Sequence, residues 1–69
     1  MQTIIDGHTV EHDNSVSRGI YYLTHELDEL ERRVYFHEAY DHGSAVFEDH
    51  MGYKYKLSLH GSEYQLTKV

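Results

Sequence analysis

The side chains of this 69-residue chain that could do chemistry are mainly seven histidines and twelve carboxylic acids. A His-Glu-x-x-His helix would place two histidines and a carboxylate around one zinc ion. The segment 37–41 begins that pattern, but Asp41 stands where the second histidine is needed. His8 and His12 share one face of a predicted strand, yet at ~3.3 Å per residue they lie about 13 Å apart, too far to share an ion. We therefore predict no metal site.

Nucleophilic catalysis needs a serine or cysteine held beside a base, and the chain has five serines and no cysteine. No serine lies in a Gly-x-Ser-x-Gly turn, and no glycine-rich loop ends in Lys-Ser or Lys-Thr. A domain of this size also has little room for a pocket that excludes water. We predict no catalytic residue and no cofactor, and we expect that the protein is not an enzyme.

The charge of the chain indicates the kind of partner to expect. Twelve acids against six bases give a formal charge of −6, and residues 1–31 carry seven of the acids with one base. An acidic face of this kind steers the approach of a basic protein. Direct binding to DNA or RNA is disfavoured, because it needs Lys and Arg to displace counterions from phosphates. The expected partner is therefore a basic protein, itself nucleic-acid-binding.

The first part of the chain has the pattern of a hairpin followed by a helix. Asp6-Gly7 lies between two β-prone runs and predicts a two-residue type I′ turn joining strands at about 2–5 and 8–12. An apolar stripe at spacings of four and three residues follows, made of Val16, Ile20, Leu23, Leu27, Leu30 and Val34. This spacing predicts one amphipathic helix over about 15–33, in which Gly19 is an unfavourable residue.

The rest of the chain has the pattern of strands. We expect a first strand around 34–40, and residues 53–60 alternate strictly between apolar and polar. A two-residue turn at Gly61-Ser62 and a three-residue turn at 50–52 set the registers of the later strands. The expected pairs are Leu59 with Tyr64, Leu57 with Leu66, His60 with Glu63, Phe47 with Tyr55, Ala45 with Leu57, and Glu48 with Lys54.

Together these patterns predict an α+β fold in one small domain over 1–69. It consists of an N-terminal β-hairpin and one amphipathic helix packed, as a second layer, on a three- to four-stranded antiparallel meander. No apolar run approaches the roughly 18 residues of a membrane span, and the first residues have no leader-like pattern. We therefore expect a cytoplasmic protein with no membrane partner.

The outward face of the predicted helix is the candidate binding surface. Residues opposite the apolar stripe point to solvent, and among them are two tyrosines and several acids. Tyrosine is enriched at the centres of protein interfaces because it offers a large contact area at low entropy cost. The predicted partner-binding residues are Tyr21, Tyr22, Glu26, Asp28, Glu29, Glu48 and Asp49.

The function predicted from these features is that of a small acidic protein-binding module. We expect an inhibitor or regulator that presents carboxylates where a basic protein would otherwise meet phosphates, of the type that phage and mobile elements use against defence systems. Two alternatives stay open. One is a histidine-dependent protein that responds to metal or pH, since histidine titrates near pH 6.5. The other is a structural homodimer.

Overall fold

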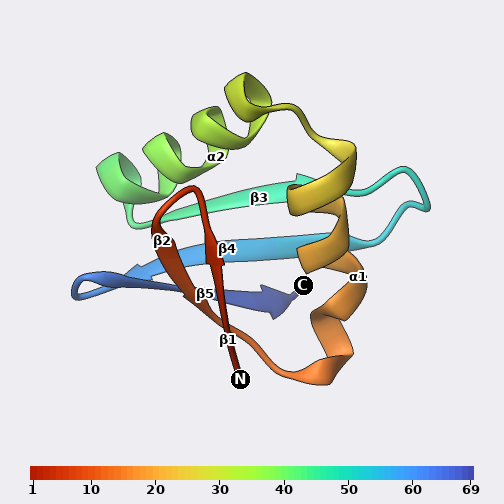
Figure 1. Ribbon diagram of the computed structural model, residues 1–69, viewed down its shortest axis with the longest axis horizontal. Helices are drawn as coiled ribbons and strands as arrows, with labels where there is room; N and C mark the ends of the chain where they lie inside the picture. The colour runs from red at the N-terminus through yellow and green to blue at the C-terminus, as the bar shows by residue number, and fades with distance from the viewer.

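The chain forms five strands and a broken helical region, described over residues 1–69 by a computed structural model (Figure 1). The strands are β1 (Gln2–Ile5), β2 (His8–Glu11), β3 (Ser44–Glu48), β4 (Lys54–His60) and β5 (Glu63–Lys68). The helical segments are the 3-10 turn η1 (Asn14–Val16), α1 (Ser17–Tyr21), the π-helical turn η2 (Tyr22–Glu26) and α2 (Glu29–His42). The predicted α+β class is confirmed.

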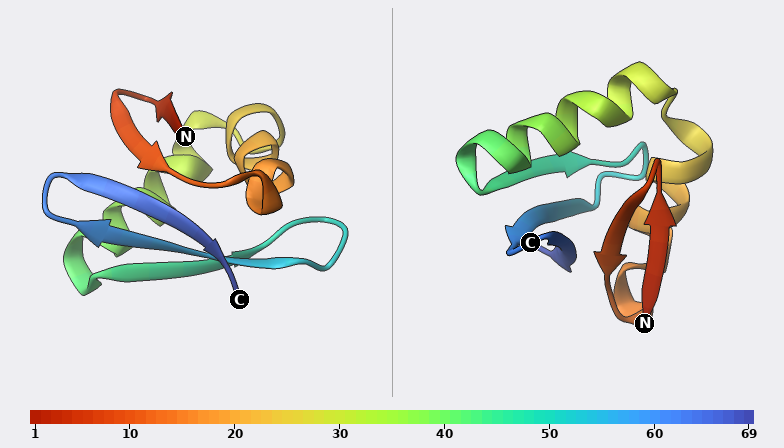
Figure 2. Two further views of the ribbon diagram at one scale, coloured as in Figure 1. Left: turned by 90° about the horizontal axis from the view of Figure 1, so that it is seen from below. Right: turned by 60° about the vertical axis from the view of Figure 1, so that its left-hand side comes forward.

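The strands form one mixed sheet in the order β1-β2-β5-β4-β3. Neighbouring strands are antiparallel except β2 and β5, which run parallel through the pairs Val10 with Tyr64 and Glu11 with Gln65. The sheet therefore has five strands, because the hairpin joins β5 instead of forming a separate unit. Figure 2 shows α2 lying along β3, with the hairpin at a steep angle to β3, β4 and β5.

The turns have the conformations that their sequences predict. Asp6 and Gly7 have φ angles of 51° and 83°, and a type I′ turn requires positive φ at both of these positions. Gly52, in the turn between β3 and β4, has φ 89°. All six predicted pairs between β3, β4 and β5 are present. The alternation of β4 therefore turns Tyr55 and Leu57 into the core, as expected.

The prediction of one helix over 15–33 is wrong, because the chain leaves helical geometry at Leu27 and Asp28. Leu27 has ψ 145° and Asp28 has ψ 174°, both extended. The Asp28 carboxylate accepts from the backbone N–H of Glu31 at 2.8 Å, and the Glu31 carboxylate accepts from that of Asp28 at 3.3 Å. This reciprocal capping box starts a second helix in a new direction.

The strand predicted around 34–40 is also wrong, since α2 continues to His42. The helix ends at Gly43, which has φ 91° and donates its N–H to the Ala39 carbonyl at 2.9 Å. After the break, the side of the helix that faces the sheet changes. Phe36 and Ala39 are buried, whereas the last residues of the predicted stripe, Leu30 and Val34, are 69% and 61% exposed.

The core lies between the helices and the curved sheet. Thirteen apolar residues form it: Ile5, Val10, Val16, Leu23, Leu27, Phe36, Ala39, Ala45, Phe47, Tyr55, Leu57, Tyr64 and Leu66. Gly19 of α1 packs directly on the Tyr55 ring, where an added Cβ would lie 2.9 Å from Cδ1. Gly19 is therefore required by packing, although its helix propensity is poor.

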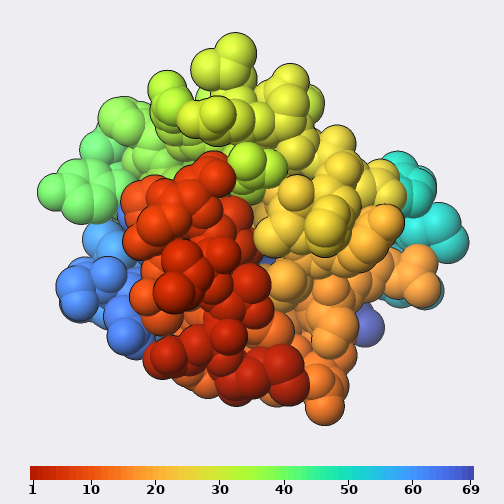
Figure 3. Space-filling view, in the orientation of Figure 1, coloured from red at the N-terminus to blue at the C-terminus, as the bar shows by residue number.

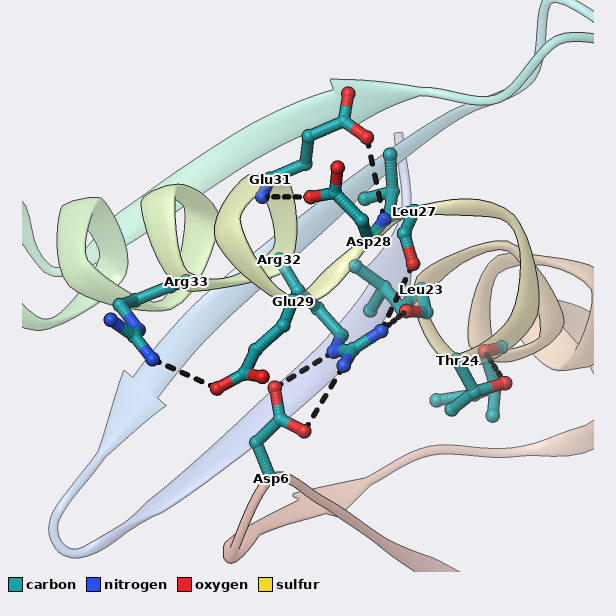
Figure 4. A network of polar contacts seen from close by, with 10 residues as sticks. Asp6, Leu23, Thr24, Leu27, Asp28, Glu29, Glu31, Arg32 and Arg33 are labelled. Carbon is teal, nitrogen blue, oxygen red and sulfur yellow. Dashed lines mark hydrogen bonds and ion pairs between the residues drawn. The ribbon is translucent and has the colours of Figure 1, made fainter.

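The Arg32 side chain connects the helix break at Leu27 to the turn of the N-terminal hairpin through hydrogen bonds (Figure 4). Its Nη1 donates to the carbonyls of Leu23 and Leu27, both at 3.0 Å, and its Nε and Nη2 donate to the Asp6 carboxylate at 2.8 and 3.1 Å. These bonds occupy carbonyls at the end of η2 that have no helical partner. Arg33, the next residue of α2, pairs instead with Glu29 of the same helix at 2.9 Å.

The contact of Gly19 with Tyr55 predicts the effect of Gly19→Ala. We expect a loss of about 1–3 kcal/mol in unfolding free energy, because overpacking against the ring exceeds the ~1 kcal/mol that alanine gains in helix propensity. Urea denaturation measures the change. Glu38→Ala, at an exposed position of α2, is the control and should change the stability little. A Gly19→Ala protein as stable as the wild type would contradict this packing.

Arg32 and Arg33 are neighbours with very different roles, which makes them a matched pair. Arg32→Ala should lower the unfolding free energy by about 2 kcal/mol, because it leaves two carbonyls and the Asp6 carboxylate without their donor. Arg33→Ala removes an exposed ion pair and should cost only a few tenths of a kcal/mol. Thermal denaturation of the two variants gives the comparison, and equal losses would refute the role given to Arg32.

Candidate functional site

An open groove lies between the α1–η2 segment and the turn that joins β3 to β4. Its volume is about 410 Å³, and its lining residues are Ser17, Arg18, Tyr21, Tyr22, Glu26, Asp49 and His50. We call it the tyrosine groove. Four of the seven residues predicted to bind a partner line it. Figure 3 shows the two segments side by side, with the helical residues in orange and yellow and the turn in cyan.

The π-helical turn η2 positions the groove's tyrosines and its acid. The Leu27 N–H donates to the Tyr22 carbonyl at 3.0 Å, the wide i to i+5 spacing of a π turn. The Thr24 hydroxyl donates to the carbonyls of Ile20 and Tyr21 at 2.9 and 3.2 Å and so supports the widened turn. Single π turns of this kind occur frequently at functional sites.

The two tyrosines differ in exposure. Tyr21 is 57% exposed, and its ring lies 4.7 Å from that of His25. Tyr22 is half-buried, with its ring stacked on Phe47 at 6.0 Å. Burial raises the pKa of Tyr22, and the neighbouring Tyr35 and the carboxylates of Glu31, Asp49 and Glu26 raise it further. The groove therefore offers one free aromatic face and one fixed aromatic wall, and its lining also includes the Glu26 carboxylate and the Arg18 guanidinium.

An ion pair closes one side of the groove. His50 Nδ1 lies 2.9 Å from Glu26 Oε2. This contact connects the β3–β4 turn to η2, and it is an ion pair when the imidazole is protonated. The His50 side chain is 60% exposed and that of Glu26 is 35% exposed. Glu26 is thus the exposed carboxylate of the groove, and a cation of a ligand would compete with His50 for it.

Asp49 was expected on the exposed binding surface, but it is buried, with 4% of its surface accessible. Its carboxylate accepts from the N–H groups of Met51 and Tyr53 at 2.9 and 3.0 Å and from the Tyr55 hydroxyl at 3.1 Å. Burial alone would raise the pKa of Asp49, but these donors together lower it. Asp49 therefore shapes the β3–β4 turn beneath the groove and has no free oxygen face for a partner.

The other predicted site residues lie outside the groove. Asp28 caps α2, Glu29 is held by Arg33, and Glu48 lies opposite Lys54 at the end of β3. All three are exposed, but the break at Leu27 separates Asp28 and Glu29 from the tyrosines. The continuous tyrosine and acid ridge expected on one helix is therefore not formed.

Three lining residues were not predicted from the sequence. Ser17, Arg18 and His50 enter the groove from two segments that meet only in the folded chain. The Asp28-x-x-Glu31 pattern was the sequence signal that could have located the helix break and separated Asp28 from the tyrosines. No local pattern marks Arg18 or His50.

The hydrogen bonds of Asp49 predict a pH-dependent effect of Asp49→Asn. A carboxylate whose pKa is lower in the folded protein than in the unfolded protein stabilises the fold at pH values above its ordinary pKa. For Asp49 this contribution is lost as the pH falls below about 4. Asn has no negative charge to lose. We expect Asp49→Asn to lower Tm by several degrees at pH 7, and we expect the gap from wild type to shrink below pH ~4. Glu48→Gln is the control. A gap that stays constant with pH would contradict the assignment.

Several kinds of feature are absent from the structure. No three His, Asp or Glu side chains lie close enough together to hold a metal ion. None of the helices combines the length and the apolar character that crossing a membrane demands.

Comparison with protein-family models, with curated proteins and with solved structures finds no match to this chain.

Proposed function

We propose that this protein is a small acidic binding module that docks on a basic protein and thereby inhibits or regulates it. The observation that carries the proposal is the tyrosine groove, in which two aromatic side chains and the Glu26 carboxylate line one open hollow. An arginine or lysine side chain of a partner fits such a site, because its cation pairs with a carboxylate and stacks on an aromatic ring.

Binding of a partner cation would involve an exchange at Glu26. In the free protein the carboxylate faces His50 at 2.9 Å. A partner guanidinium, which is always charged and presents several donors, competes well with an imidazole that is charged only when protonated. His50 is therefore the competitor that a partner cation must displace from Glu26.

The overall charge supports a basic partner. The formal charge of −6 speeds encounter with a basic surface, and such surfaces are typical of proteins that bind nucleic acids. The acids that remain exposed without a cationic partner, such as Glu38 and Glu48, add to this long-range attraction. The tyrosine groove would then supply the specific contact.

Self-association is a second candidate, favoured by one observation. Leu30 and Val34 are exposed on the outer side of α2, beside Arg33 and His37. A second copy could cover these apolar side chains. Sedimentation at micromolar concentration distinguishes a monomer that awaits a different partner from a homodimer.

The proposed docking site predicts different effects for two substitutions that remove the same charge. With a fluorescein-labelled hexa-arginine peptide as probe, Glu26→Gln should weaken binding by about fivefold or more, because it removes the carboxylate of the groove. Glu38→Gln removes an exposed acid on α2 outside the groove and should change affinity by less than about twofold. Fluorescence anisotropy at constant ionic strength measures both affinities.

A third variant separates the role of the groove from that of overall charge. His50→Gln removes the competitor for Glu26 and should strengthen peptide binding. Equal losses in Glu26→Gln and Glu38→Gln would show that the peptide responds only to net charge, and the groove would then not be the docking site.

A further inference from the structure

A second, smaller hollow lies on the other side of Arg18 from the tyrosine groove. Its volume is about 200 Å³, and its lining residues are Ser15, Arg18, Tyr53, Tyr55 and Lys68. We call it the cationic hollow. Arg18 comes from α1, Tyr53 directly precedes β4, Tyr55 lies in β4, and Lys68 ends β5, so only the tertiary fold brings these residues together.

Two cations converge on one ring in this hollow. The Arg18 guanidinium carbon lies 5.9 Å from the centre of the Tyr53 ring, and the Lys68 ammonium lies 5.3 Å from the same centre. The ring attracts each cation through its negative face, and both cations line the same hollow. Like charges brought together in this way repel each other unless an anion lies between them.

Neither cation has a carboxylate partner. Arg32 and Arg33 form ion pairs with Asp6 and Glu29, whereas no ion pair involves Arg18 or Lys68. Lys54 and Lys56 are also unpaired, but Arg18 and Lys68 are the two unpaired cations that line the same hollow. The two positive charges are therefore free to bind a ligand.

The acids nearest to the hollow are already occupied. Asp13 accepts hydrogen bonds from both the backbone N–H and the hydroxyl of Ser15, and Asp49 is buried behind Tyr55, whose hydroxyl donates to it. No carboxylate lines the hollow itself. Burial and Asp49 raise the pKa of Tyr55, and the nearby Arg18 guanidinium opposes this rise.

We propose that the cationic hollow binds a dianionic oxyanion, a phosphoryl group, between Arg18 and Lys68. Two full positive charges match the charge of a phosphate dianion. A guanidinium and an ammonium together also offer more hydrogen-bond donors than one carboxylate can accept. The site goes beyond the proposed docking of a basic partner, and it does not require that function. Free phosphate and a phosphorylated side chain share this chemistry.

Titration followed by NMR of the ¹⁵N-labelled protein tests the site at constant ionic strength and pH 7.5. The probes are inorganic phosphate, N-acetylphosphoserine amide and, as a monoanion, acetate. Both phosphoryl compounds should saturate shifts of the Arg18, Tyr53 and Lys68 amides at concentrations well below those that acetate requires. The phosphoryl compound that binds more tightly identifies the source of the group.

Substitutions on the two faces of the sheet supply the matched control. Lys68→Gln should weaken phosphate binding about tenfold, because it removes one of two charge-assisted contacts. Lys56→Gln removes the same charge from a β4 position that points to the opposite face from Tyr55 and should leave affinity within about twofold.

The outcomes that overturn the proposal are distinct from a failure of the proposed function. An absence of saturation by either phosphoryl compound, or equal weakening in Lys68→Gln and Lys56→Gln, would refute the site. Equal affinity for acetate and phosphate would refute its assignment to a dianion. Because Lys68 does not line the tyrosine groove, its replacement should leave binding of the hexa-arginine peptide unimpaired, so the two sites are tested separately.

Discussion

The break in the helical region at Leu27 and Asp28 is the constraint on which the rest of the structure depends. A continuous helix over 15–42 would be about 42 Å long at 1.5 Å per residue, whereas the longest dimension of the molecule is 29 Å. The capping box of Asp28 and Glu31 and the four bonds of Arg32 stabilise the change of direction. One helical piece can then cover β3 and β4 while the other lines the β3–β4 turn.

The break also decides which carboxylates are available for binding. Asp6, Asp28, Glu31 and Asp49 are engaged in bonds that hold the fold together. In the proposed function, the formal charge of −6 would therefore contribute to long-range attraction more than to specific contacts. The acid that combines exposure with aromatic neighbours is Glu26, and the protein keeps it beside a histidine that a stronger cation can displace.

The parts of the fold that were predicted correctly share a local cause. Two-residue and three-residue turns dictate which residues face each other, and strand alternation has a period of two, so a wrong register would expose Leu57 or Leu66. The helix prediction failed for the opposite reason. Spacings of three and four residues continue across Leu27 without interruption, and the stripe alone carries no information about a break.

By itself, the sequence determined the hairpin, the strand registers, the acidic balance and the exposure of Tyr21, because each depends on turn chemistry, periodicity or composition. Only the tertiary structure decided that Leu30 and Val34 face solvent, that Asp49 is buried, and that Arg18 lies between two hollows with different charge. These properties arise where segments distant in sequence meet. Their positions follow from the packing of the whole core, which no local pattern encodes.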